Sequence, residues 1–125
     1  MSEKLTWSFT AGSSSGIGLD DAGSMDLEAT TAASIQLDAA MNNATGLALQ
    51  LADVNKVSFL AITASRYDGS VKVKADGADD TDLDGPLILF GEGVKLFADD
   101  LSTLSVQNAH QTEAATLSIV IGRKL

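Results

Sequence analysis

Apolar residues recur at every second position along much of this chain, and no other feature of the sequence constrains the fold as strongly. Residues 5–10 (LTWSFT), 26–38 and 71–74 all alternate in this way. Successive side chains of a β-strand point to opposite faces, whereas an amphipathic helix needs apolar spacings of three and four. The spacing therefore predicts strands with one buried and one wet face, as in antiparallel sheets.

The main competing interpretation is a helix over residues 27–40, which are rich in alanine. Thr30, Thr31 and Ile35 are β-branched, which restricts their side chains in a helix, and the apolar spacing is two. A strand over residues 26–38 is therefore favoured. The turn cluster at residues 42–46 then predicts that residues 47–51 pair back onto this strand.

Further patterns refine the expected sheets. Residues 57–65 are apolar on both faces, which indicates a strand in the middle of a sheet or between subunits. Lysines alternate with valines over residues 71–74, after the Asp68-Gly69 turn signal, and this is typical of a hairpin that leads into a solvent-facing edge strand. Other apolar runs predict strands at residues 87–90, 94–97, 101–106 and 115–121.

Together these patterns predict an all-β fold, either an antiparallel β-sandwich or a jelly-roll-like barrel of about eight to ten short strands. A chain of 125 residues fits one domain, 1–125. Within it, residues 11–25 are rich in glycine, serine and aspartate, so we expect a flexible loop or arm there.

Charge and composition exclude several classes of function. The formal net charge of −9 repels phosphate backbones and anionic lipids, so neither nucleic-acid binding nor membrane binding is expected. The chain has no cysteine and one histidine, His110, which excludes thiolate zinc sites and multi-histidine metal sites. Residues 1–7 lack an apolar signal core, so we expect a soluble chain made in the cytoplasm.

The glycine-rich segment 10–18 (TAGSSSGIG) looks like the phosphate turn of short-chain dehydrogenases. In that family the turn follows a buried parallel strand and opens a helix. Here residues 5–10 alternate with polar residues, and residues 19–23 are a poor start for a helix. The only tyrosine, Tyr67, also lacks the family's lysine four residues later, where Val71 stands. We therefore interpret the segment as a glycine-rich loop and expect no cofactor.

The acidic segment 80–85 (DTDLDG) matches the opening of an EF-hand calcium loop. The match fails at the twelfth position, where Gly91 stands in place of a bidentate glutamate, and Pro86 follows the turn glycine. No metal site is expected. A calcium loop of another kind, formed by Asp79, Asp80, Asp82 and Asp84 with Asp76 nearby, remains the alternative, because clustered carboxylates repel one another and a hard cation relieves that repulsion.

No catalytic constellation emerges. His110 is the only imidazole base, and it lies in a polar stretch without the strained turn that presents a serine nucleophile. Carboxylate pairs can be chosen from the 17 acidic residues, but one tryptophan and one tyrosine offer little for a sugar platform. We expect a protein that is not an enzyme. Small residues dominate the chain, and such surfaces suit closely packed oligomers or lattices.

Three segments resemble small β-rich structural proteins of tailed phages: residues 83–89 (LDGPLIL), 101–108 (LSTLSVQN) and 119–123 (IVIGR). The resemblance spans roughly residues 57–123 and rests on strand patterns, not on a chemical signature. Proteins of this group coat the capsid as cement or decoration trimers that clamp neighbouring major capsid proteins. The resemblance implies a homotrimer on the virion surface that stabilises the lattice of the major capsid protein. The alternatives are a calcium- or carbohydrate-binding β-sandwich module of a spike or adhesin, and a tail-tube subunit.

Overall fold

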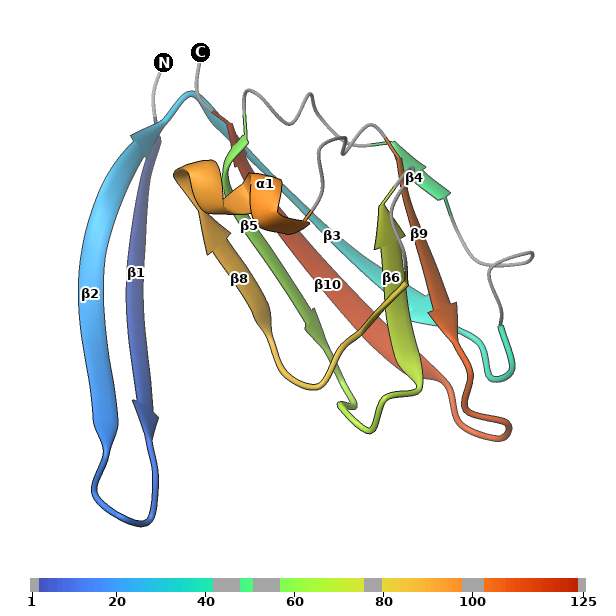
Figure 1. The fold of residues 1–125 in the computed structure, drawn as a ribbon. Coiled ribbons are helices and arrows are strands. Elements are labelled where there is room, and N and C mark those ends of the chain that lie inside the picture. Colours follow the sequence, from blue (N-terminus) through green and yellow to red (C-terminus); the bar gives the residue numbers. More distant parts are fainter. Residues whose placement is uncertain (1–2, 42–47, 51–56, 76–79, 98–102, 124–125) are drawn as a thin grey trace.

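The computed structural model describes residues 3–41, 48–50, 57–75, 80–97 and 103–123, which form antiparallel strands and one short helix (Figure 1). The strands are β1 (Glu3–Gly12), β2 (Gly18–Leu27), β3 (Ala29–Leu37), β4 (Ala48–Gln50), β5 (Val57–Ala64), β6 (Val71–Ala75), β7 (Thr81–Asp82), β8 (Leu87–Phe90), β9 (Thr103–Asn108) and β10 (Ala115–Arg123). The helix is α1 (Val94–Phe97), preceded by a 3-10 turn (Gly91–Gly93). The described residues contain no helix with the length and hydropathy needed to cross a bilayer.

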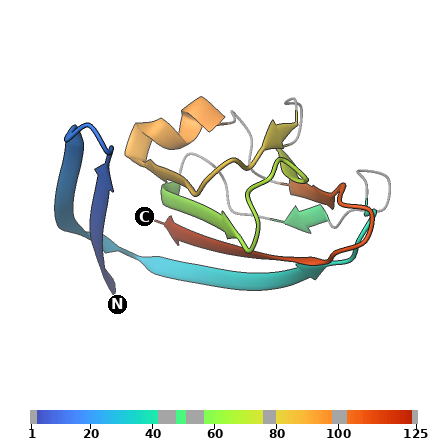
Figure 2. The same ribbon diagram turned by 90° about the horizontal axis from the view of Figure 1, so that it is seen from below.

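The strands form two four-stranded sheets and a separate hairpin. The first sheet has the order β3-β10-β5-β8 and the second has the order β4-β9-β6-β7. The hairpin of β1 and β2, called the arm below, stands beside the sandwich (Figures 1 and 2). An isolated bridge between Met41 and Asn108 links the end of β3 to β9, but the sheets do not close into a barrel. The predicted all-β sandwich is confirmed; the jelly-roll-like barrel is not.

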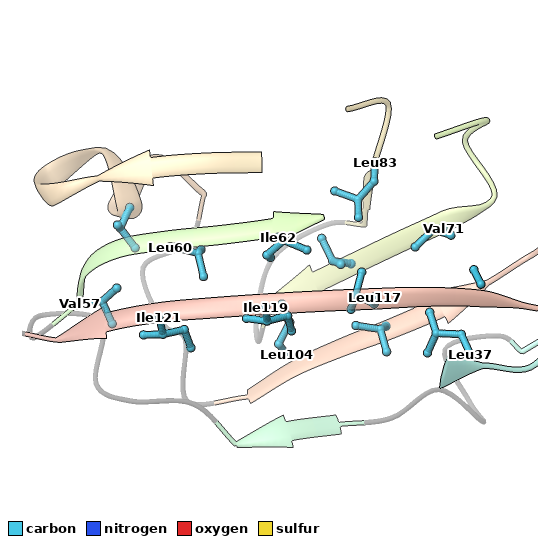
Figure 3. Packing of buried hydrophobic residues seen from close by; sticks show 14 residues of the cluster. Leu37, Val57, Leu60, Ile62, Val71, Leu83, Leu104, Leu117, Ile119 and Ile121 are labelled. Carbon is cyan, nitrogen blue, oxygen red and sulfur yellow. The ribbon is translucent and has the colours of Figure 1, made fainter. Parts of the chain in front are cut away.

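The core lies between the two sheets (Figure 3). Alternation explains its composition, because every second residue of the inner strands points inward. Each such aliphatic side chain contributes about 1.5–3 kcal/mol when it is fully buried. The first sheet supplies Leu60, Ile62, Leu117, Ile119 and Ile121, and the second supplies Val71, Val73, Leu104 and Val106. The prediction that β5 is an interior strand is confirmed, since it pairs with β10 and β8.

The segment predicted as one strand over residues 26–38 is a strand and not a helix, but it is divided. Leu27 ends β2, the chain bends at Glu28, and β3 begins at Ala29. The amide of Glu28 donates to the carbonyl of Arg123 at 2.8 Å, which fixes this bend against the end of β10. One run of alternating residues therefore serves both the arm and the first sheet.

Two predictions about the position of strands within the sheets are wrong. Strand β4 pairs with β9, not with β3, while the predicted turn at residues 42–46 lies outside the described residues. Strand β6 is not an edge strand, because it lies between β9 and the two-residue β7, where Lys72 pairs with Asp82 at 2.6 Å. Alternation reports which face of a strand is buried but does not identify its neighbours.

The Asp68-Gly69 turn does not close a hairpin either. It carries the chain from β5 in the first sheet to β6 in the second, so the two strands that it joins are not paired. Gly69 has a φ of +87°, a conformation that glycine adopts without a steric penalty. The prediction of a turn at Asp68-Gly69 is confirmed, but the prediction that this turn closes a hairpin is wrong.

The strand predicted over residues 94–97 is the helix α1. Gly91 has a φ of +54° and turns the chain at the end of β8. Val94 is then buried in the core, and Phe97 packs against the same core three residues later, a spacing that suits a helical turn. Leu96 points away and is 88% exposed. A four-residue apolar run does not distinguish a strand from one helical turn.

Candidate functional site

The arm is the most exposed part of the described chain, and it includes residues 11–25, where a loop or an arm was expected. Only residues 13–17 form a turn there, because β2 continues from Gly18 to Leu27 and pairs along its whole length with β1. Strand pairing with β1 supplies the backbone hydrogen bonds that the glycine- and aspartate-rich sequence alone does not favour. The arm is thus a regular hairpin with a short loop at its tip.

The register of the arm separates two faces. Trp7 lies opposite Gly23, and Leu5 lies opposite Met25. Because paired residues share a face, one face is mostly apolar and the other is polar. The mostly apolar face carries Leu5, Trp7, Phe9, Ala11, Leu19, Gly23, Met25 and Leu27, together with two carboxylates, Glu3 at the base and Asp21. The polar face carries Lys4, Thr6, Ser8, Thr10, Asp20, Ala22, Ser24 and Asp26.

Two contacts anchor the base of the arm to the first sheet. Leu27 is 2% exposed and lies over Gly122, where an added Cβ would overlap the Leu27 side chain. The ring of Trp7 packs at a tilt of 51° against Phe90 of β8 with centroids 4.9 Å apart, and Phe90 in turn packs against Phe59 with centroids 5.1 Å apart. Gly23 makes room for the indole, since a Cβ at that position would lie 2.8 Å from the ring.

A groove of about 450 Å³ opens between the arm and the edge of the first sheet. Its apolar walls come from both sides: Trp7, Phe9 and Leu19 from the arm, and Phe59, Ile88 and Phe90 from the sheet. The arm is covered only near its base, because Phe9 is 44% exposed, Leu19 58% and Ile17 75%. Asp21 is the one ionisable side chain in the lining.

The outer face of the first sheet, which points away from the core, is uncharged. The strand register identifies the residues of this face, because residues paired across neighbouring strands point to the same side of a sheet. Phe59 and Ala61 of β5 and Val120 and Gly122 of β10 point outward, and so do their partners on β3 and β8. Threonine, serine and alanine predominate on the half formed by β3 and β10. The outer face comprises Thr30, Ala32, Ser34 and Gln36 of β3, Thr116, Ser118, Val120 and Gly122 of β10, Phe59, Ala61 and Thr63 of β5, and Ile88 and Phe90 of β8.

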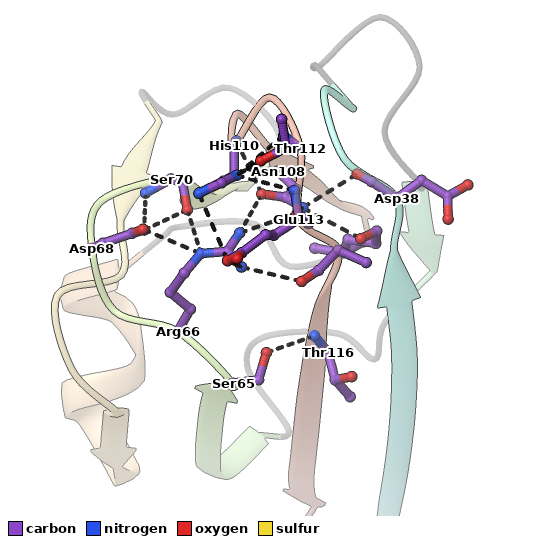
Figure 4. A network of polar contacts seen from close by, with 12 residues as sticks. Asp38, Ser65, Arg66, Asp68, Ser70, Asn108, His110, Thr112, Glu113 and Thr116 are labelled. Carbon is purple, nitrogen blue, oxygen red and sulfur yellow. Dashed lines mark hydrogen bonds and ion pairs between the residues drawn. The ribbon is translucent and has the colours of Figure 1, made fainter.

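A polar network centred on Asn108 joins the loops at one end of the sandwich (Figure 4). Asn108 is fully buried at the end of β9. Its Nδ2 donates to the carbonyls of Leu37, Asp38 and Glu113 at 3.3, 3.3 and 2.8 Å. Its Oδ1 accepts from Arg66 at 2.8 Å and from the amide of His110 at 3.1 Å. One side chain thus connects β3, the β5–β6 loop and the β9–β10 loop.

Arg66 is the second centre of this network, and its side chain is 17% exposed. It donates through Nε to Ser70 at 3.0 Å and through Nη1 to the carbonyl of Ala114 at 3.1 Å. The guanidinium also pairs with Asp68 at 3.2 Å and lies 3.8 Å from Glu113. These contacts hold the two loops in place, which is a structural role.

The Ser70 hydroxyl donates to Asp68, the Ser70 amide does so at 3.0 Å, and both bonds lower the pKa of that carboxyl from its ordinary 3.8. Because the folded-state pKa is depressed, the stabilisation is present above the unfolded value and is lost as pH falls through the folded value. We expect Ser70→Ala to raise the Asp68 pKa toward 3.8, as measured by NMR titration of the carboxyl carbon. Ser65→Ala, which alters a different loop contact, is the control, and equal midpoints in both variants would contradict this assignment.

The glycine-rich segment 10–18 lies at the tip of the arm. The amides of Ser13 and Gly16 donate to backbone carbonyls within the loop, at 2.7 and 3.1 Å, and the Ile17 amide donates to the Ser13 hydroxyl at 3.3 Å. Strand β2 follows the loop, where the dehydrogenase turn is followed by a helix. These amides are used in closing the tip, so they are not free to receive a phosphate.

The acidic residues suggested for calcium are only partly described, since Asp76 and Asp79 lie outside the described residues. Asp80 and Asp84 are exposed, and Asp82 pairs with Lys72. In the described ranges, no group of three or more carboxylate or imidazole side chains is placed to hold a metal ion.

We expect millimolar calcium to change the melting temperature no more than sodium chloride of equal ionic strength, because Asp82 already has a cationic partner. Differential scanning calorimetry of the wild type and of Asp80→Asn/Asp82→Asn provides the comparison. A calcium-specific rise of several degrees that disappears in the double variant would instead support a calcium loop.

The two candidate catalytic side chains take part in loop contacts. The Nδ1 atom of His110 accepts from the amides of Thr112 and Glu113 at 3.2 and 3.1 Å. Its other ring nitrogen lies 3.8 Å from the Glu113 carboxylate. The Tyr67 hydroxyl accepts from the amide of Ala64 at 3.1 Å. None of these contacts of His110 is with a serine side chain.

No protein-family model matches this chain, and neither a curated protein nor a solved structure matches it at a significant level.

Sequence reasoning missed the Asn108 network and the second strand of the arm. Asn108 could have been found from alternation, because it continues the inward positions of Leu104 and Val106. A polar residue at a buried position requires hydrogen-bond partners. Arg66 gives no such signal, because its partners Asn108, Glu113 and Ala114 lie far away in the sequence.

Proposed function

We propose that this protein is a non-enzymatic structural subunit of a tailed-phage virion, which binds the lattice of the major capsid protein as a cement or decoration protein. The observation that carries the proposal is the arm, whose apolar face is covered at its base and open beyond Trp7. Exposed apolar surface of this kind marks a site of protein contact. An isolated two-stranded hairpin is marginally stable in water, so its outer half gains most from contact with another surface.

The groove beside the arm supports binding over catalysis. Its lining is mostly aromatic and aliphatic, with the hydroxyls of Thr6 and Ser8 and with Asp21 as its one ionisable group. A hydrolytic or acid–base site requires at least a positioned base and a group that it activates. The resemblance of residues 57–123 to phage structural proteins gives this binding role its context. The calcium- or carbohydrate-binding module and the tail-tube subunit are not favoured by any specific contact in the described residues.

The test is binding to expanded capsids of the phage concerned, prepared without this protein. Purified protein is mixed with the capsids and pelleted by ultracentrifugation. We expect saturable co-sedimentation at a fixed ratio to the major capsid protein, together with a higher temperature of capsid disruption. Protein that stays in the supernatant at every concentration, while the capsids remain intact, would contradict the proposal.

A further inference from the structure

We propose that the groove beside the arm binds an arginine side chain of the capsid partner, with the guanidinium packed on the aromatic rings of the groove and paired with Asp21. The inference rests on the proposed function and deepens it, because it names the kind of side chain that the partner presents to this site.

Aromatic rings are concentrated in this groove. The chain has four phenylalanines, one tryptophan and one tyrosine, and three of the phenylalanines and the tryptophan line the groove. Trp7, Phe90 and Phe59 pack on one another at its base, while Phe9 is 44% exposed and Phe90 36%. The faces of aromatic rings carry partial negative charge and attract cations. A guanidinium is planar and weakly hydrated, so it stacks well on such rings.

Asp21 supplies the charge that pairs with an arginine. It lies directly opposite Phe9 in the hairpin register, so its carboxylate shares a face with the rings of Phe9 and Trp7. Within the described ranges this carboxylate has no cationic partner and accepts only from the amide of Ala22, at 3.1 Å. Lys4, the one basic residue of the arm, lies on the opposite face. The carboxylate can therefore receive a guanidinium.

This combination of groups favours a cation over other occupants. An apolar side chain that covers the rings also displaces water from Asp21, and a carboxylate that loses water without gaining a partner opposes the contact. An acidic group is repelled by Asp21 and by the net charge of −9. Arginine meets both requirements, because its flat face packs on the rings and its N–H groups donate to carboxylate oxygens. The net charge likewise attracts a basic partner and disfavours a second copy of this chain.

The first test measures whether the groove recognises the charge itself. The probes are a capped pentapeptide with arginine between two leucines and its counterpart with citrulline, which has nearly the same shape and no charge. Trp7 is the only tryptophan, so its indole N–H resonance in an NMR titration reports on the groove. We expect saturable binding of the arginine peptide and at least about threefold weaker binding of the citrulline peptide.

Two matched variants assign this preference to Asp21. Asp21→Asn and Asp20→Asn remove the same charge from neighbouring positions on opposite faces of the arm. Asp21→Asn should bind the two peptides about equally, whereas Asp20→Asn should keep the wild-type preference for arginine. Circular dichroism reports whether each variant is folded. Wild-type protein that shows no saturable binding at millimolar peptide or binds both peptides equally, or the same loss of preference in both variants, would overturn the proposal.

The second test determines whether the capsid supplies this arginine. In the co-sedimentation assay we expect Asp21→Asn to bind expanded capsids at least about threefold more weakly than the wild type, and Asp20→Asn to bind within about 1.5-fold of it. Capsid binding that Asp21→Asn leaves unchanged would overturn the proposal and leave the proposed function standing. Wild-type protein that prefers the arginine peptide but does not pellet with capsids would contradict the proposed function, and with it the capsid as the source of the arginine.

Discussion

Replacing Asn108 with alanine is expected to lower the free energy of unfolding by about 3–5 kcal/mol, a large effect for one polar side chain. The carbonyls of Leu37, Asp38 and Glu113 lose their donor, and Arg66 loses an acceptor 2.8 Å away. Buried groups that lose a partner incur the full cost of desolvation, about 1–3 kcal/mol each, although neighbouring groups and water recover part of it. Urea unfolding measures the change.

Gln107 supplies the matched control for this prediction. It precedes Asn108 on β9 and points to the opposite side of the strand, where it is only half buried. Gln107→Ala should change the free energy of unfolding by less than about 1 kcal/mol. Equal losses in the two variants would mean that the network is not the main source of stability at this end of the sandwich.

The second large effect concerns the anchor of the arm. Leu27→Ala should cost about 2–5 kcal/mol, because the side chain is 2% exposed and its removal leaves a cavity over Gly122. Gly122→Ala should cost about 1–3 kcal/mol, because the added methyl group overlaps Leu27 and lies 3.3 Å from the Cβ of Phe59.

The double variant Leu27→Ala/Gly122→Ala tests whether the two single losses come from one shared contact or from two independent sites. With Leu27 shortened, the methyl group that Gly122→Ala adds occupies part of the vacated space, so the double variant should lose at least about 1 kcal/mol less than the sum of the single losses. Thermal or urea unfolding of the four proteins provides the cycle, and Leu96→Ala, at an 88% exposed position, is the control for a leucine outside the core. Additive losses would show that Leu27 and Gly122 do not pack together.

Much of the sandwich could be predicted from alternation alone. The inward residues of β9 and β10 are the ones that the period of two identifies, because burial of one face selects apolar side chains at every second position. Strand β5 is apolar on both faces, so its pattern predicts an interior strand but not which of its residues point inward. The pairing of β4 with β9 could not be predicted, since the same pattern suits either neighbour. Residues 94–97 form a helical turn because Gly91 redirects the chain, which the apolar pattern does not encode.

The arm also shows that local sequence does not determine strand pairing. Glycine and aspartate disfavour an isolated strand, yet β2 forms because β1 supplies its backbone partners and Gly23 accommodates Trp7. The apolar face was visible in Leu5, Trp7 and Phe9. The groove that this face forms with Phe59, Ile88 and Phe90 was not, because it depends on which part of the first sheet lies beside the arm.

The most direct test of the central claim is the copy number of this protein in purified virions. Particles of the phage concerned are purified by density gradient, and quantitative mass spectrometry measures the molar ratio of this protein to the major capsid protein. A virion structural role predicts a fixed, reproducible ratio that persists after nuclease treatment and repeated banding. Its absence from purified particles, or a ratio that falls toward zero on purification, would contradict the account.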